Sequence, residues 1–417
     1  MNFPKMLRAR FRPERRRKIS KRTVFILIFV GAVAAILTAC AGPGGGDEAG
    51  TAGTVKIGIN APLTGSISKV GEGTKFAAAM WLKDNPVLEV GGKRYKVALI
   101  IEDNESNAES ATKANVKLIT QDQVLVIVGP QLSKQAVPAG GVANDLKTPM
   151  ISPWSTNPNT TRDRPWVFRT PFLDAFQGSV LANFATQEFG AEQAAVLYDV
   201  ASDYPRDLAE FFKQAWEAIH GPGSVVAFEP FTTGATDFSA QLIKIKNSGA
   251  DVLFLPQYYN EVALIVPQAR QLGWEKPILG SDSWGSAELI RLCGEPCYGS
   301  FFSTHYVAKG AQGATKAFID RYKEKYGYVP DDVAALTWDA MHIVKKAILD
   351  CGKLTGEIER DRQCVRDAMA NIKEFDGITG KMSFNDQGDP IKCAVIVQIS
   401  DQGEFEFYKQ VCPEDMK

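Results

Sequence analysis

Short apolar runs rich in β-branched residues alternate with helical stretches along most of this chain of 417 residues. This alternation is the feature that most constrains the fold, because strands that are apolar on both faces need helices on both sides. The expected strands are 55–60, 96–102, 124–128, 150–152, 194–198, 224–231, 252–256 and 277–280. The expected helices are 73–85, 108–121, 136–146, 177–189, 206–219, 238–247, 259–272, 315–326, 333–349 and 363–371.

This number of strand–helix units exceeds what one ordinary sheet needs. We therefore expect an α/β protein with two doubly wound parallel-sheet lobes, and the length is also that of two domains. The rhythm changes after residue 371, where a segment at 377–383 precedes two strands at 393–397 and 405–411. A terminal hairpin that returns to one lobe after helices of the other predicts chain crossings between the lobes.

The N-terminal segment has the parts of a secretory signal. Ten Lys and Arg residues surround a single Glu, an apolar run follows at 23–35, and Leu37-Thr38-Ala39 precedes Cys40. This ending resembles the bacterial lipobox, in which the cysteine becomes the lipidated first residue. The alternative is an uncut membrane anchor, but the run is shorter than the roughly 20 residues that span a bilayer. We expect a signal peptide at 1–39, lipid on Cys40 and a Gly-rich tether at 40–53, hence an extracytoplasmic, lipid-anchored protein.

The charge of the expected mature chain is clearly negative. The leader holds ten basic residues and one acidic residue, which leaves 37 basic and 47 acidic residues from Cys40 onward. A net charge near −10 argues against nucleic acid as a partner and against electrostatic docking on anionic lipid. Beyond the leader, no apolar stretch is long enough to cross a membrane.

Six cysteines remain besides Cys40, and an even number in an exported chain indicates three disulfides. Fifteen pairings are possible, and the sequence alone does not choose among them. Folding the hairpin about residues 402 and 403 places Cys393 opposite Cys412, within disulfide reach. Proximity favours Cys293–Cys297 and Cys351–Cys364. Zinc is the alternative, but the Cys293–Cys297 spacing fits only half of a zinc pattern, so no metal site is expected.

A series of short motifs then resembles the branched-chain amino acid binding proteins, the type I periplasmic substrate-binding proteins of ABC importers. In family order, the motifs are Val55–Gly58 with Ala61–Gly65, Ile127–Pro130, Met150–Pro153, Thr156–Pro158, Phe168–Thr170, Thr236–Ser239, Gln268–Arg270, Leu279–Asp282 and Phe384–Gly388. The resemblance covers nearly the whole mature chain. It implies two lobes joined by three crossovers, with a ligand cleft between them. The expected lobes are 54–174 plus 306–378, and 175–305 plus 379–417.

The resemblance also implies the binding residues of the first lobe. Ser133 matches a serine that holds the substrate carboxylate with backbone N–H groups at a helix N-terminus, which favours anions. Trp154, Ser155 and Thr156 match a loop whose carbonyl and hydroxyl groups contact the amino acid. From the residues alone, Ser133 also fits an N-cap and Ser155–Pro158 an ordinary turn.

In the second lobe, Asp282 matches the position of an acid that pairs with the substrate ammonium, where the family more often has Glu. Its alternative role is the N-cap of a helix near Ser286. Tyr204 and Tyr258 match aromatic rings that close over the ligand, although Pro205 replaces the usual Gly. Both are otherwise packing residues. Trp154 and Trp284 stand where small residues are common, so we expect them to fill part of the side-chain pocket.

Catalytic motifs are absent from the sequence. His220, His305 and His342 are far apart, and they are interpreted as structural or surface residues. Neither a dinucleotide fingerprint, a phosphate-binding loop nor a nucleophile elbow is present. We therefore expect no enzyme and no cofactor.

These observations together predict an extracytoplasmic binding lipoprotein of an ABC importer, which captures an amino acid or small amide by hinge closure. Its expected partners are the permease subunits with their cytoplasmic ATPases and the membrane, through the lipid, and the protein is expected to be a monomer. The main alternative is a receptor that signals ligand occupancy to a membrane partner. An exported enzyme is a more distant one.

Overall fold

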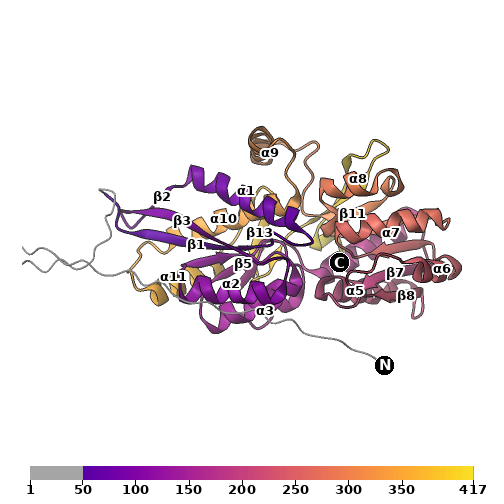
Figure 1. The fold of residues 1–417 in the computed structure, drawn as a ribbon, viewed down its shortest axis with the longest axis horizontal. Coiled ribbons are helices and arrows are strands. Elements are labelled where there is room, and N and C mark those ends of the chain that lie inside the picture. The colour runs from indigo at the N-terminus through magenta and orange to yellow at the C-terminus, as the bar shows by residue number, and fades with distance from the viewer. Residues whose placement is uncertain (1–49, 417) are drawn as a thin grey trace, which may run out of the picture. The chain divides into compact units, whose positions relative to one another are not determined.

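Two large sheets organise residues 50–416, the part of the chain that this computed structural model describes (Figure 1). The expected signal peptide, Cys40 and most of the expected tether lie outside the described residues. No helix within residues 50–416 combines the length and apolar character that crossing a membrane requires. The two sheets define two lobes, and both lobes combine parallel strands with covering helices, as the sequence predicts.

The first lobe is built on a six-stranded sheet of order β2-β3-β1-β4-β5-β6. Its strands are β1 (Thr54–Ala61), β2 (Val87–Val90), β3 (Lys93–Asp103), β4 (Val126–Val128), β5 (Met150–Ser152) and β6 (Val167–Arg169). All neighbours are parallel except β2 and β3, which form an antiparallel edge. The helices of this lobe are α1 (Ser68–Asp84), α2 (Ala108–Thr120), α3 (Ser133–Asp145), α9 (Gly313–Tyr326), α10 (Asp332–Asp350) and α11 (Ile358–Ala370).

The second lobe has a seven-stranded sheet of order β16-β15-β11-β10-β9-β7-β8. Its strands are β7 (Ala194–Asp199), β8 (Val225–Phe231), β9 (Val252–Leu255), β10 (Ile278–Gly280), β11 (Phe301–Thr304), β15 (Ala394–Ile399) and β16 (Phe405–Val411). β15 and β16 form the expected C-terminal hairpin, which adds to β11 in antiparallel orientation. The helices are α4 (Asp174–Phe189), α5 (Asp203–His220), α6 (Ser239–Asn247), α7 (Tyr259–Gln271) and α8 (Ala287–Cys293). Short 3₁₀ turns are η1 (Pro158–Thr160), η2 (Asp282–Trp284), η3 (Glu295–Cys297) and η4 (Pro413–Met416).

The chain passes between the lobes three times, after β6, after β11 and before β15. A small sheet of β12 (Phe375–Gly377), β13 (Gly380–Phe384) and β14 (Pro390–Ile391) precedes the last passage. It belongs to the first lobe, because Phe384 packs on Phe168 and the Arg169 N–H donates to the Gly388 carbonyl. The structure thus differs from the expected boundary at 379, since residues 380–391 contact the first lobe and only the hairpin returns to the second.

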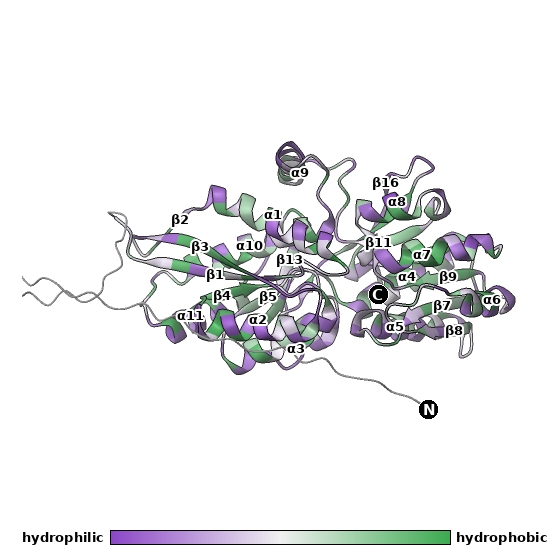
Figure 2. Ribbon diagram, in the orientation of Figure 1, coloured by the Kyte–Doolittle hydropathy of each residue, from purple (hydrophilic) through white to green (hydrophobic). Residues whose placement is uncertain are grey.

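Burial on both faces explains why the strands could be predicted from continuous apolar runs in the sequence. β4 is buried at all of its positions, and Figure 2 shows it in hydrophobic colouring, whereas α2 carries both hydrophobic and hydrophilic residues. A strand covered on both faces has no polar side, whereas a helix on the surface has one. The strands that the sequence did not predict include the three-residue β6 and the edge strand β2.

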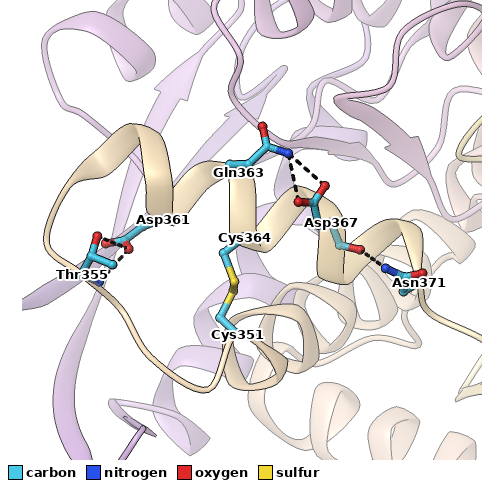
Figure 3. The surroundings of a disulfide bond; sticks show 7 residues. All are labelled: Cys351, Thr355, Asp361, Gln363, Cys364, Asp367 and Asn371. Carbon is cyan, nitrogen blue, oxygen red and sulfur yellow. Dashed lines mark hydrogen bonds between the residues drawn. A yellow bond between two sulfur atoms is a disulfide. The ribbon is translucent and has the colours of Figure 1, made fainter.

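Three disulfides are present in the structure: Cys293–Cys297, Cys351–Cys364 and Cys393–Cys412. The first and third lie in the second lobe, and the second joins the end of α10 to α11 in the first lobe (Figure 3). Next to it, the Thr355 hydroxyl donates to Asp361 at 2.8 Å, which fixes the loop between these two helices. In the hairpin, Ala394 lies opposite Val411, so the two cysteines that flank this pair also face each other.

Candidate functional site

A small, nearly filled cavity lies between residues of the two lobes. Its lining residues are Gln131, Ser133 and Trp154 from the first lobe and Tyr204, Tyr258, Asp282 and Ser283 from the second. Most of them follow the carboxyl ends of strands, which is where open α/β sheets bind ligands. Of the seven expected binding residues, five line this cavity. The other two, Ser155 and Thr156, follow Trp154 in the same loop.

The first lobe contributes hydroxyl groups and a helix N-terminus. Ser133 is the first residue of α3, and its hydroxyl accepts a hydrogen bond from the Ser155 hydroxyl at 2.9 Å. The N-cap position belongs to Leu132, and no side chain caps the helix. The N-terminal N–H groups of α3 therefore remain available to an anion. Thr156 is fully buried, and its hydroxyl lies beside the Asp174 carboxylate without a well-formed hydrogen bond to it.

Arg169 does not line the cavity but stabilises the loop that carries Ser155. Its guanidinium donates to the Ser155 carbonyl at 2.9 Å and to the Thr161 hydroxyl at 2.6 Å. It also forms a buried ion pair with Asp389 at 2.7 Å. Asp389 comes from the segment before β14, so the C-terminal part of the chain fixes the position of a loop more than 200 residues earlier. The Phe-Arg-Thr motif is thus a support for the site.

The second lobe contributes a carboxylate in a fixed orientation. Asp282 begins η2 directly after β10, and it is only 1% exposed. Its Oδ1 accepts hydrogen bonds from Tyr204 Oη at 2.6 Å and Gln177 Nε2 at 2.9 Å. Burial and the neighbouring Asp282 charge raise the pKa of Tyr204 well above its usual value, so its phenol stays a donor. The cap of α8 is instead Ser286, whose hydroxyl accepts from the Glu288 N–H. Asp282 therefore does not serve as that cap.

Aromatic rings form one wall of the cavity. The Tyr258 ring lies 5.3 Å from that of Tyr204 and 5.9 Å from that of Trp154, measured between centroids. The Trp154 indole N–H donates to Asp332 Oδ2 at 3.0 Å, which holds the ring in place. Trp284 behaves differently from the expectation. It is fully buried against Gly280 and Phe302 in the second lobe and does not line the cavity.

Four polar residues at or beside the site were not predicted as binding residues from the sequence, and one of them, His305, was interpreted as structural or surface. They are Gln131, Asp174, His305 and Asp332. All four are buried, and the Gln131 amide, the Asp174 carboxylate and the His305 ring have atoms without a hydrogen-bond partner. Burial and the charge of Asp282 raise the pKa of Asp174 well above its usual value. The available signal was their position, since each stands between a strand and a helix or at the first residue of a helix.

The comparison with known families decides the assignment. The family model "Periplasmic binding protein" matches residues 54–404, which is most of the chain. This chain belongs to the periplasmic binding protein family. The fold and the resemblance expected from the motifs are thereby confirmed.

Several periplasmic binding proteins are similar to this chain over most of its length. The leucine-, isoleucine-, valine-, threonine- and alanine-binding protein of Pseudomonas aeruginosa is 28% identical over 342 residues, which cover 81% of this chain and 87% of that protein. The structure of a leucine-binding protein, LivK, from Thermotoga maritima is 33% identical with a TM-score of 0.80, covering 87% of this chain and 100% of that one. The structure of LivJ from Streptococcus pneumoniae, a branched-chain amino acid transporter substrate-binding protein in complex with isoleucine, is 30% identical with a TM-score of 0.77, covering 86% and 100%.

Membership of this family has two direct consequences. Periplasmic binding proteins bind solutes rather than convert them, so the expectation that the chain is not an enzyme is supported by its relatives. The family also works outside the cytoplasm, in agreement with the location that the sequence indicates.

Proposed function

We propose that this chain captures a small α-amino acid between its two lobes and delivers it to the permease of an ABC importer. The observation that carries the proposal is the complementary chemistry on the two sides of one cavity. Hydroxyl groups and a helix N-terminus face it from the first lobe, and a buried carboxylate faces it from the second. A zwitterion presents the matching pair of charges.

On the first-lobe side, the ligand carboxylate would accept hydrogen bonds from Ser133 and from the N-terminal N–H groups of α3. A helix N-terminus carries partial positive charge, and hydrogen bonds to charged groups are the stronger kind. Ser155 orients the Ser133 hydroxyl, and Thr156 offers a further hydroxyl, which lies beside the Asp174 carboxylate. These three residues therefore form the proposed anion side of the site.

On the second-lobe side, Asp282 would pair with the ligand ammonium. A carboxylate removed from water needs a cation or strong donors, and Tyr204 and Gln177 satisfy only one of its oxygens. The rings of Tyr204 and Tyr258 would cover the aliphatic part of the ligand. Asp174 lies near Asp282. One ammonium could donate to both carboxylates, because it carries several N–H donors.

The position of Trp154 in the cavity wall favours a ligand with a small side chain. Trp154 occupies the space next to Tyr258 and is held by Asp332. We therefore propose alanine-, threonine- or valine-sized ligands ahead of leucine, within the class that the relative's name describes.

Isothermal titration calorimetry against single amino acids and small amides tests the proposal. The expected result is one-to-one binding of at least one small neutral amino acid, with affinity falling as the side chain grows. Amides that lack the carboxylate are the control for the anion side. Binding of no amino acid at all would refute the proposed function.

Trp154→Ala tests the size limit separately. Removing the indole enlarges the cavity, so the preference is expected to shift toward leucine and isoleucine, while alanine binding weakens. An unchanged order of affinities would show that Trp154 does not set ligand size. Trp284→Phe, which changes an indole outside the cavity, is the matched control.

We further propose that the mature protein begins at Cys40 and carries lipid there, which keeps a monomeric receptor close to its permease. The basic segment, the apolar run and Leu37-Thr38-Ala39 support this proposal. A tether of about a dozen residues would leave the lobes free while raising the local concentration near the membrane partner. Mass spectrometry of the mature protein should find diacylglycerol on Cys40, and a free thiol would refute the anchor.

A further inference from the structure

Three buried side chains that could bind a metal ion form a cluster beside the proposed amino acid cavity, and one of them, Asp282, also lines it. Asp282 in η2, His305 directly after β11 and Asp332 at the start of α10 each offer one ligand atom, and these atoms all lie within 4.8 Å of one another. The three side chains are 1–2% exposed. They come from both lobes, because α10 packs on α1 and β4 of the first lobe whereas η2 and β11 belong to the second.

The atoms of this cluster are incompletely satisfied. Neither ring nitrogen of His305 has a hydrogen-bond partner, and His305 Nε2 is 3.5 Å from Asp282 Oδ2, longer than a good hydrogen bond. Tyr204 and Gln177 donate to Asp282 Oδ1 and leave Oδ2 to the cluster. A buried histidine with two unpartnered nitrogens is costly, so something is expected to bind there.

The neighbouring Arg and Lys side chains do not neutralise the carboxylates of this cluster. Arg169 is paired with Asp389. Lys392 is close enough to act on Asp332 and His305, but its ammonium donates to Thr379 and its charge is opposed mainly by buried Asp339. With both cations balanced in this way, the carboxylates of Asp174, Asp282 and Asp332 remain without a matching positive charge among the described residues around the cavity.

We propose that Asp282, His305 and Asp332 bind a divalent transition-metal ion that joins the two lobes. Two carboxylates and one imidazole are a ligand set that suits Zn²⁺ or Mn²⁺, whereas Mg²⁺ and Ca²⁺ favour oxygen ligands alone. The atoms are already so close that a bare ion fits between them, while an organic cation needs more room. Without the ion, the Asp282 and Asp332 carboxylates lie close together across the lobe boundary with no cation between them.

The charge of the proposed ligand fits this ion. The ion would bind Oδ2 of Asp282, so the ligand ammonium would share this carboxylate with the ion and also reach Asp174. One ammonium and one divalent ion together balance the charges of Asp174, Asp282 and Asp332. This count rests on the proposed function, but the cluster itself does not, because the metal is titrated without any amino acid. Metal binding is also expected to release protons, since the ligands must be deprotonated.

The test is calorimetric titration of the chelator-treated, dialysed protein with Zn²⁺ or Mn²⁺ alone. One-to-one binding is expected, with Mg²⁺ giving none, and heats that depend on the buffer's ionisation enthalpy should reveal the proton release. Asp332→Asn keeps an acceptor for Trp154, and His305→Gln keeps a polar side chain. Each should weaken binding by at least about 100-fold, because loss of supporting partners alone already costs 10- to 100-fold.

His342→Gln is the matched control, since His342 is also a largely buried histidine with an unpartnered nitrogen but lies outside the cluster. It should bind the metal as the unchanged protein does. The proposal of a metal site would be overturned if neither Zn²⁺ nor Mn²⁺ bound. It would also be overturned if the Asp332 and His305 variants bound the metal as tightly as the unchanged protein does. Asp332-dependent binding of a diamine without metal binding would do the same. Amino acid binding that persists in chelator would leave the proposed function intact, so the two failures are distinguishable.

Discussion

The two lobes have the same architecture but present opposite chemistry to the cavity. The first lobe offers Ser133 and the N-terminus of α3, and its nearest cation, Arg169, is turned to the back of the loop. The second lobe offers Asp282 within a phenol and amide network. Among the residues that line the cavity, those of the first lobe are thus suited to an anion and those of the second to a cation, whereas Asp332 of the first lobe lies beside the cavity in the proposed metal cluster. Neither lobe holds a zwitterion alone, which is a physical reason for binding between lobes.

Removing the Asp282 carboxylate from the second lobe should have the largest effect on ligand binding. Asp282→Ala should weaken amino acid binding by about 3–5 kcal/mol, or roughly 150- to 4,000-fold, because the ligand ammonium loses its main charged partner. Calorimetry measures the loss. Asp237→Ala, an exposed acid of the same lobe, is the control, and thermal unfolding verifies that the variants are folded. Undiminished affinity would remove Asp282 from the site.

Stability should also distinguish the lobes, beginning with Glu261 in α7 of the second lobe. Burial and the nearby Asp199 charge raise the pKa of Glu261 to about 7. A carboxyl with a raised folded-state pKa loses stability as pH rises from its unfolded value near 4.5 through about 7. Glu261→Gln should therefore raise the free energy of unfolding at pH 8 by about 2–3 kcal/mol and change little at pH 4. Urea unfolding at both pH values checks this, and an equal effect at both would contradict it.

The first-lobe side of the cavity is tested by a smaller change. Ser133→Ala removes one hydrogen bond to the ligand carboxylate and should cost about 2 kcal/mol of binding, or about 30-fold. The backbone N–H groups of α3 remain, so binding is weakened rather than abolished. Ser179→Ala, on the surface of α4, is the matched serine control. A loss as large as that of Asp282→Ala would show that the two sides are not as different as proposed.

His342 in α10 gives the first lobe the opposite response to pH. Burial, with the charge of Lys345, lowers the pKa of His342 to about 4. The unfolded chain then binds the proton more readily, so stability is lost as pH falls from about 6.5 toward 4. His342→Phe keeps a ring between Trp81 and Trp338 and should reduce this loss by about 1 kcal/mol at pH 5. Urea unfolding at pH 7 and pH 5 measures it, and an identical pH slope in both proteins would contradict the assignment.

The sequence predicted the elements of both lobes and most of the cavity wall. Strands buried on both faces give continuous apolar runs, and their helices give a periodic pattern, so both are local signals. The binding loops were reached because they follow such strands and because the motifs around them resemble a known family. Short β6 and edge strand β2 were missed, since few residues carry too little pattern.

The sequence therefore determined the fold class, the two lobes and the loops that end at the cavity, because each depends on residues close together in the chain. Only the tertiary structure decided which polar groups meet. Asp389 supports a loop through Arg169, Trp284 packs away from the cavity, and His305 lies beside Asp332 rather than in an isolated structural position. Contacts between residues far apart in sequence leave no spacing to recognise, and only the packing of the two sheets and their helices brings them together.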